Sequence, residues 1–310
     1  MRWEKKGVIF AANKNFDWMV SHAQIPVVDP IRSNVLRIYF GTRDRNGRSH
    51  PAYVEVEPSD PQRILRICET AVLPLGEVGT FDDNGITPSW IVDHNNKRYL
   101  YYIGWRPQVT VPYHLSIGLA ISENRGESYR KFSAGPILDR DVDEPYFNTA
   151  PCVLVDRDIW RMWYVSCTRW QTIKGKLEPF YNVKYAESSD GIHWRRTAKT
   201  CIDYDHFAEG IGRPCVFLQD KLYKMIYSYR SATDYRTDRK QSYRLGYAES
   251  SDGINWERKD DEVGIDRSDA GWDSEMMAYS YVYHCDDRTY MFYNGNGFGK
   301  SGFGYALLGS

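Results

Sequence analysis

The chain contains no apolar run long enough to span a membrane, and its first residues include no apolar core of a signal peptide. Its formal net charge is only −1, and Lys and Arg are spread along all 310 residues without a basic cluster. These absences argue against a membrane anchor and a nucleic-acid-binding face. We therefore expect a cytoplasmic protein that binds neither a membrane nor a nucleic acid; the sequence does not indicate its oligomeric state.

Cysteine is also scarce, with six residues, and none stands at the spacing of a metal site. Several lie inside predicted strands, which favours reduced thiols in the core over disulfide bonds. Cys152 and Cys215 each follow a proline by one residue, and we expect both side chains to pack between neighbouring structural units. The sequence predicts no metal site and no cofactor.

Aromatic residues, by contrast, are abundant: they make up 15% of the chain and include 24 Tyr and 10 Trp. The string YAESSDGIHWRR at Tyr185–Arg196 returns 62 residues later as YAESSDGINWER at Tyr247–Arg258. A near-identical string at that distance indicates an internal repeat. Each copy is typical of a strand, a Ser-Asp-Gly turn and a second strand, because Asp-Gly supplies the positive φ of a tight hairpin.

Prolines before apolar runs recur with the same period. The four are Pro26, Pro88, Pro151 and Pro214, spaced by 62, 63 and 63 residues, and placing Ser280 in the same phase gives a last step of 66. Each of the five resulting units contains a proline segment, an aromatic strand, a Tyr-Ala-Glu-Ser-like strand and a Trp strand. Four-stranded units repeated in a ring predict an all-β fold, a five-bladed β-propeller of antiparallel blades that fills residues 1–310 as a single domain.

Two further features shape this prediction. The fifth unit ends at its third strand, Gly302–Leu308, and the first residues resemble the missing fourth strand, so we expect Trp3–Phe10 to complete the fifth blade and close the ring. Three inserts separate the second strand of a unit from the third, at Arg106–His114, Trp170–Tyr181 and Ala232–Ser242. We expect these inserts to be loops on one face that build the wall of a single cleft.

The inner strand of each blade lines the central channel, so aligned residues should meet at its mouth. Five positions before the aligned proline or serine, three units carry carboxylates: Asp83, Glu209 and Glu275. In such a group one carboxyl can stay protonated while another stays ionised, and glycoside cleavage requires that pair. We therefore predict that these three residues converge on one pocket and act as catalytic acid and base.

Other polar residues close to these aligned positions are predicted to bind the substrate. They are His22, Gln24, Arg43, Asp44, Glu144, Arg213 and Asp273. Arg213 stands one position before its proline, as Thr87 and Ala150 do in other units, and its guanidinium could hold a sugar acid or orient a carboxylate. The alternative interpretation is that the acidic residues only cap turns or form surface ion pairs.

The five units, the acidic segments before the inner strands and the Tyr-Ala-x-Ser-x-Asp-Gly-x-x-Trp hairpins together resemble the five-bladed β-propeller glycoside hydrolases, among them families 32, 43, 68, 117 and 130. The resemblance implies a funnel-shaped site at one end of the axis, with acids from the first, second and a later blade. Asp83 matches the second-blade position, and Glu209 or Glu144 could supply the later acid. The segment Ser21–Gln24 stands at the first-blade position and contains no Asp.

The function that follows is a glycoside hydrolase-like enzyme, which cleaves or transfers a glycosidic bond of a carbohydrate or glycoside by carboxylate acid/base catalysis. One alternative is a non-catalytic carbohydrate-binding propeller. Another is a glycoside phosphorylase, which would need basic residues for phosphate, and for that role Arg43 and Arg213 are the candidates.

Overall fold

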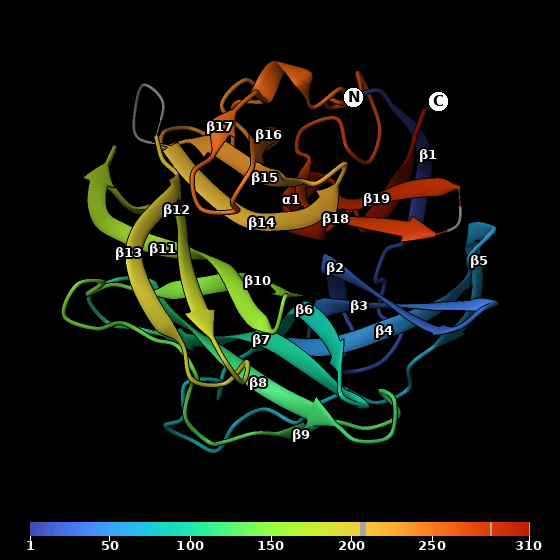
Figure 1. Cartoon of the computed structure of the whole chain (residues 1–310), viewed down its shortest axis with the longest axis horizontal. Coiled ribbons are helices and arrows are strands. Elements are labelled where there is room, and N and C mark those ends of the chain that lie inside the picture. Colours follow the sequence, from blue (N-terminus) through green and yellow to red (C-terminus); the bar gives the residue numbers. More distant parts are fainter. Residues whose placement is uncertain (205–208, 286, 310) are drawn as a thin grey trace.

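The computed structural model describes residues 1–204, 209–285 and 287–309, and the side chain of Glu209 also lies outside this description. The strands form four-stranded antiparallel sheets arranged around a central axis (Figure 1). Two of these sheets are joined by a single parallel pair between Tyr181 and Gly210. The predicted five-bladed β-propeller is confirmed.

The blades follow the chain in order. Blade one consists of β2 (Ser21–Arg32), β3 (Val35–Arg43), β4 (Ser49–Glu57) and β5 (Asp60–Ile67). Blade two consists of β6 (Ile86–His94), β7 (Lys97–Pro107), β8 (Tyr113–Ser122) and β9 (Arg130–Lys131). Blade three consists of β10 (Asn148–Asp156), β11 (Ile159–Ile173), β12 (Lys176–Ser188) and β13 (Arg195–Ile202).

The last two blades contain the helical segments as well. Blade four consists of β14 (Glu209–Gln219), β15 (Leu222–Ser231), β16 (Arg244–Ser250) and β17 (Glu257–Arg258), followed by the 3₁₀ turn η1 (Asp260–Glu262). Blade five consists of β18 (Ala278–Cys285), β19 (Arg288–Asn294), β20 (Phe303–Leu308) and β1 (Trp3–Phe10), with the short helix α1 (Asn296–Gly299) between β19 and β20. Within the described residues no helix has the length and apolarity to cross a membrane.

The ring is closed by the first strand of the chain. Strand β1 runs antiparallel to β20, with Trp3 opposite Leu308 and Phe10 opposite Phe303. The two termini consequently lie near each other at one edge of the propeller (Figure 1). The predicted closure of the fifth blade by Trp3–Phe10 is confirmed.

The repeated hairpins join neighbouring blades. In the first copy, Asp190 Oδ1 accepts hydrogen bonds from the backbone amides two and three residues further on, at 2.8 and 2.9 Å, which is turn chemistry. The carbonyl of Gly191 accepts from Tyr101 Oη of the preceding blade at 2.8 Å. Gly253 of the second copy likewise accepts from Trp163 Nε1 at 2.7 Å. Each turn therefore packs against the aromatic strand of the blade before it.

The inner strands pack against each other through small polar groups. Cys152 Sγ accepts a hydrogen bond from the backbone N–H of Val216 at 3.2 Å, and Cys215 Sγ accepts from Val282 at 3.1 Å. Both thiols are buried and free. These two side chains pack between blades, as the sequence predicted.

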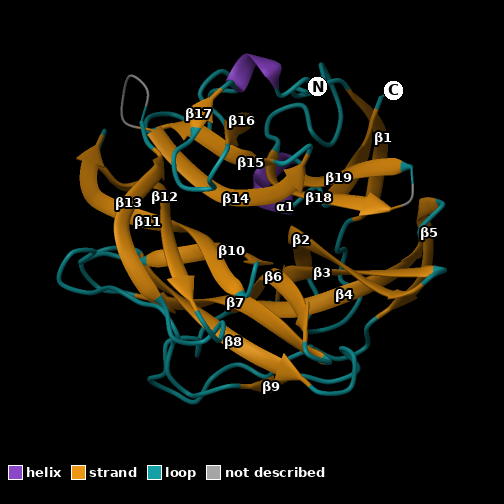
Figure 2. Ribbon diagram, in the orientation of Figure 1, coloured by secondary structure: helices purple, strands orange, loops and turns teal. Residues whose placement is uncertain are grey.

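One of the three inserts is not the loop that we expected. Residues of Trp170–Tyr181 extend β11 and β12 into a long paired hairpin, with Ile173 opposite Lys176 at its end. The insert is rich in β-branched and aromatic residues, and Gly175 has the positive φ (78°) that a two-residue turn requires. The insert Ala232–Ser242 does lie between strands, and five of the nine residues of Arg106–His114 form the connection between β7 and β8 (Figure 2).

Candidate functional site

A bulge interrupts each inner strand at the aligned proline or serine. The pairing register shifts between Gln24/Val27, Pro88/Trp90, Thr149/Cys152, Gly212/Cys215 and Ala278/Tyr281. Proline has no N–H for the ladder and is therefore found at such bulges. The residue before the aligned position has a positive φ in four blades, namely Ile25, Ala150, Arg213 and Tyr279. Bulges redirect side chains, and here they place these residues at the mouth of the channel.

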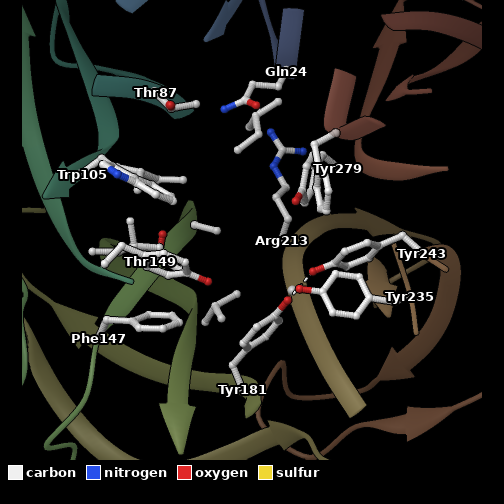
Figure 3. A pocket seen from close by; sticks show the side chains of 18 of the residues that line it. Gln24, Thr87, Trp105, Phe147, Thr149, Tyr181, Arg213, Tyr235, Tyr243 and Tyr279 are labelled. Atoms are coloured by element: carbon white, nitrogen blue, oxygen red, sulfur yellow. Dashed lines mark hydrogen bonds between the residues drawn. The ribbon is translucent and has the colours of Figure 1, made fainter. Parts of the chain in front are cut away.

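These residues surround a cavity of about 320 Å³ on the axis (Figure 3). Trp105 and Phe147 lie on one side of it, and Tyr181, Tyr243 and Tyr279 lie on the other. The remaining lining residues are Gln24, Ile25, Arg43, Thr87, Ile103, Tyr113, Leu115, Thr149, Ala150, Val165, Gly212, Arg213, Tyr235, Arg236 and Phe298. Every one of the three inserts contributes a tyrosine to the lining, so all three border a single cavity, as predicted.

Arg213 is buried where the inner strands converge. Its guanidinium donates to the carbonyls of Ser280, of Pro26 at 3.2 Å and of Ser89 at 3.0 Å, which belong to three other blades. It also lies 5.7 Å from the ring centres of both Trp90 and Tyr281. Burial lowers the pKa of Arg213. Arg213 therefore forms the floor of the cavity and ties four blades together.

Blade one supplies a second arginine at the cavity. Arg43, at the end of β3, is half-buried and donates one long hydrogen bond of 3.4 Å to Gln24 Oε1. Burial lowers the pKa of Arg43. Nearby His22 is a half-buried residue whose pKa is lowered to about 4 by burial, then by Arg43 and Lys300. Its ring Nδ1 lies 2.9 Å from Ser21 Oγ.

A third arginine lies behind the tyrosines of the opposite wall. Arg230 Nε donates to the hydroxyl oxygens of Tyr181 at 3.1 Å and Tyr243 at 3.3 Å, and these two hydroxyls are hydrogen-bonded to each other. The Arg230 guanidinium stacks 3.8 Å from the ring centre of Tyr235. Burial raises the pKa of Tyr181 and of Tyr243, so both hydroxyls stay protonated at neutral pH.

Two proteins of Mycobacterium tuberculosis are similar to the chain over its whole length. "Uncharacterized protein MT1551" is 37% identical and "Uncharacterized protein Rv1502" is 36% identical, each over 309 residues that cover 99% of both chains. The chain belongs to the same family as these two mycobacterial proteins. No sequence model of a known protein family matches the chain.

Solved structures show which fold this family has. A "Glycoside hydrolase" superimposes with a TM-score of 0.76 at 18% identity and covers 98% of this chain and 90% of that chain. A thermostable family 43 glycoside hydrolase gives a TM-score of 0.68 at 17% identity, with 96% and 91% covered. An exo-1,5-alpha-L-arabinanase from a bovine ruminal metagenomic library gives 0.61 at 15% identity, with 95% and 94% covered. The family shares the five-bladed propeller of glycoside hydrolases.

The structure does not bring the three predicted catalytic carboxylates together in the cavity. Asp83 lies in the segment before β6, where its Oδ2 accepts from the backbone N–H of Gly79 at 2.8 Å, outside the cavity lining. Glu275 is exposed, and its backbone N–H donates to Asn296 Oδ1 at 2.7 Å. The side chain of Glu209 is outside the described residues. The predicted convergence of Asp83 and Glu275 on the axial pocket is therefore wrong.

The acids predicted to bind substrate have partners within the blades instead. Asp273 is buried and accepts from Tyr293 Oη at 3.0 Å and from Lys5 Nζ at 2.7 Å. Glu144 is buried and accepts from Tyr164 Oη at 2.7 Å. Asp82 makes the same kinds of contact in blade two: its Oδ2 accepts from Tyr102 Oη at 3.0 Å and pairs with Lys131 Nζ at 2.7 Å. These carboxylates fasten the segment before the inner strand to its own blade.

Asp44 is likewise a turn residue. Its Oδ1 accepts from the backbone N–H groups of Asn46 and Arg48, both at 2.9 Å, and its Oδ2 is paired with Arg48 Nε at 2.8 Å. Burial raises the pKa of Asp44, but hydrogen bonds with His50, then Arg48 and Asn46, lower it overall. Of the ten predicted site residues, the structure places Gln24, Arg43 and Arg213 on the cavity, and His22 stands beside Arg43.

The sequence prediction missed the aromatic wall. Trp105 lies near the end of β7 and Phe147 directly precedes β10, while Tyr181, Tyr235 and Tyr243 belong to or adjoin the inserts. Two signals could have found the cavity: the position directly before each aligned proline, and the tyrosines of the inserts. In the described part of the chain, no group of three or more His, Cys, Asp or Glu side chains is arranged to hold a metal ion.

Proposed function

We propose that this protein binds a carbohydrate in the axial cavity. The observation that supports this most directly is the aromatic lining: Trp105, Phe147 and Tyr279 surround a space of about 320 Å³. Pockets of this size that combine ring faces with a few polar groups are suited to one small ligand. Gln24 and Thr149 supply polar groups of the kind that hydrogen-bond sugar hydroxyls.

The shared fold supports the same class of ligand. A family 32 beta-fructofuranosidase of Bombyx mori with this fold was solved in complex with sucrose; its TM-score to the chain is 0.59 at 14% identity, and the match covers 93% of this chain and 61% of that chain. The binding proposal does not require a pair of carboxylates in the cavity, and among the described residues no Asp or Glu lines it.

A second candidate function is cleavage or transfer of a glycosidic bond. The full-length likeness to glycoside hydrolases favours it. The acid that remains for this role is Glu209, because β14 begins there and its Gly212 and Arg213 line the cavity. A phosphorylase would use the same cavity with phosphate as the attacking group.

Binding can be tested by titrating a panel of saccharides while following tryptophan fluorescence and heat. We expect binding by the wild type and a loss of at least tenfold in affinity for Trp105→Ala. Trp18→Ala is the matched control, because Trp18 is half-buried outside the cavity. Equal affinities of the two variants would contradict the proposed site.

Turnover is tested separately on a panel of aryl glycosides, with and without phosphate. If the second candidate is right, the wild type releases the aryl group and Glu209→Gln loses this activity while its melting temperature is unchanged. Saccharide binding without turnover in the wild type would leave binding as the function.

A further inference from the structure

The cavity has more positively charged than negatively charged side chains among the described residues. Three arginines line it, and of these only Arg236 has a carboxylate partner in the described part of the chain, Glu178 Oε1 at 2.5 Å. Arg213 is bonded to carbonyl oxygens, which leave its charge uncompensated. Arg230, behind the tyrosines, is bonded to hydroxyl and carbonyl oxygens in the same way. Buried charges in proteins are normally paired, so these arginines, which have no carboxylate partner among the described residues, favour an anionic group in the cavity.

Arg43 has guanidinium N–H donors that make no hydrogen bond within the described residues. A guanidinium has five N–H donors, and Arg43 gives one long hydrogen bond to Gln24 within the described residues. Its half-buried position makes an unpaired charge unfavourable, because desolvation penalises the charged form. The donors of Arg43 and the carboxamide of Gln24 lie on the same cavity edge, where a ligand group can accept from both.

The backbone at this edge is held in an unusual conformation. Strand β2 has an extra register shift, between Ser21 and Gln24, in addition to the bulge shared by all blades. His22 and Ile25, on either side of Gln24, both have positive φ, 64° and 58°. Such conformations cost energy and are found preferentially at ligand sites. Among the inner strands, as far as the structure describes them, only β2 has a further register shift before the aligned position, and this shift presents Gln24 beside Arg43.

We infer that the carbohydrate bound in this cavity carries an anionic oxygen group, a carboxylate or a phosphate, which binds to Arg43 and Gln24. This inference rests on the proposed carbohydrate-binding function and specifies the chemical class of its ligand. Arg43 can bind either group with two parallel N–H···O hydrogen bonds, while Gln24 contributes a neutral donor. The uncompensated charges of Arg213 and Arg230 favour the same ligand charge at longer range.

The first experiment compares ligands that differ only in charge. The full-length protein is titrated with matched neutral, uronic-acid-bearing and phosphorylated glycans at two salt concentrations. We expect the anionic member of a matched set to bind at least tenfold more tightly than the neutral one, with a preference that falls as salt rises. The uronate and phosphate arms identify which anion is recognised.

Variants then assign the preference to Arg43. Arg43→Gln should reduce affinity for the anionic glycan at least tenfold and abolish the preference over its neutral counterpart. Arg45→Gln is the control, because Arg45 is exposed and paired with Asp17 at 2.5 Å. Neutral and anionic glycans binding with equal affinity would overturn this inference and leave the proposed function intact. Failure of every glycan to bind would overturn the proposed function itself.

His22 gives a readout that does not depend on affinity. Its ring faces Ser21 and lies in the field of Arg43 and Lys300. An anion on Arg43 must raise the pKa of His22, because it offsets a nearby positive charge. Titration of the His22 ring by NMR, with and without inorganic phosphate or the anionic glycan, should show this rise in the wild type and not in Arg43→Gln. An unchanged His22 titration in the presence of a bound anionic glycan would place the anion elsewhere.

Discussion

Asn294 of the fifth blade is hydrogen-bonded to both sides of the bulge at Ile25 in the first blade. Its Oδ1 accepts from the Ile25 N–H at 2.7 Å, and its Nδ2 donates to the Ala23 carbonyl at 2.6 Å. Asn294 is fully buried. One amide side chain thus fixes the backbone that presents Gln24 to the cavity, and it does so across the joint where the ring closes.

Replacing this amide should affect both stability and binding. We expect Asn294→Ala to lower the free energy of unfolding by about 2–6 kcal/mol, because two buried backbone groups lose their partners at about 1–3 kcal/mol each. Glycan affinity should fall as well, since Gln24 is no longer held in place. Urea denaturation and calorimetric titration check the two effects. Asn46→Ala, at an exposed turn, is the control; unchanged glycan affinity in Asn294→Ala would show that the bulge does not shape the site.

The repeat made the fold predictable. Two near-identical hairpins and four evenly spaced prolines determine the length of one blade, and the likeness of the first residues to a fourth strand predicts the closure. These signals are strong because each blade must meet the same packing demands, so the same residue types return at the same positions. The bulges follow from the prolines for the same reason, since proline cannot donate to the ladder.

The site was less predictable because equivalent sequence positions in different units need not occupy equivalent places in space outside the strands. The bulge recurs at the same position of each inner strand, so Arg213 and Ala150 both reach the cavity. The segments before the strands have no such constraint, and a carboxylate five positions earlier can lie in a turn, as Asp83 does. The aromatic wall comes from inserts of different lengths, which cannot be aligned between units.

Arg213 offers a test of how the blades are held on the axis. We expect Arg213→Met to lower the free energy of unfolding by roughly 3 kcal/mol or more, since three buried carbonyls lose a donor and each unsatisfied group costs about 1–3 kcal/mol. Chemical denaturation measures the loss, and Arg66→Met serves as an exposed control. Equal stability of the Arg213 variant and the wild type would mean that the three carbonyls do not depend on the guanidinium.

The buried acids should matter for stability and not for binding. Asp273→Asn is expected to lower the free energy of unfolding by about 2–4 kcal/mol, because Tyr293 and Lys5 lose a charged acceptor in a buried place. Because Asp273 lies outside the cavity lining, glycan affinity should be unchanged. A double-mutant cycle with Tyr293→Phe should show coupling between the two side chains. Lost glycan binding at unaltered stability would restore Asp273 as a substrate-binding residue.

The unprotonated state of His22 should make stability depend on pH in a defined window. The pKa of His22 in the folded protein is about 4, against an ordinary value of 6.5, mainly because burial disfavours the charged ring. Between these two values the unfolded chain binds a proton that the folded chain does not. Stability is therefore fully present above about pH 6.5 and is lost as pH falls toward 4.

This window lies above that of the carboxyl groups, and His284 contributes to it as well, because burial also lowers the pKa of His284. The pKa values of Asp190 and Asp252 are lowered by the hydrogen bonds of their turns, so the stability that they contribute is lost only below about pH 4. We expect His22→Gln to flatten the stability profile between pH 4.5 and 6.5, measured by urea denaturation at several pH values. The slope removed should be less than the roughly 1.4 kcal/mol per pH unit of one full proton, because His22 is only partly buried and its charge is partly screened by solvent. A variant with the same slope as the wild type would show that another group titrates there.

Saturating anionic glycan should also flatten the wild-type profile, since an anion on Arg43 brings the folded pKa of His22 closer to its unfolded value.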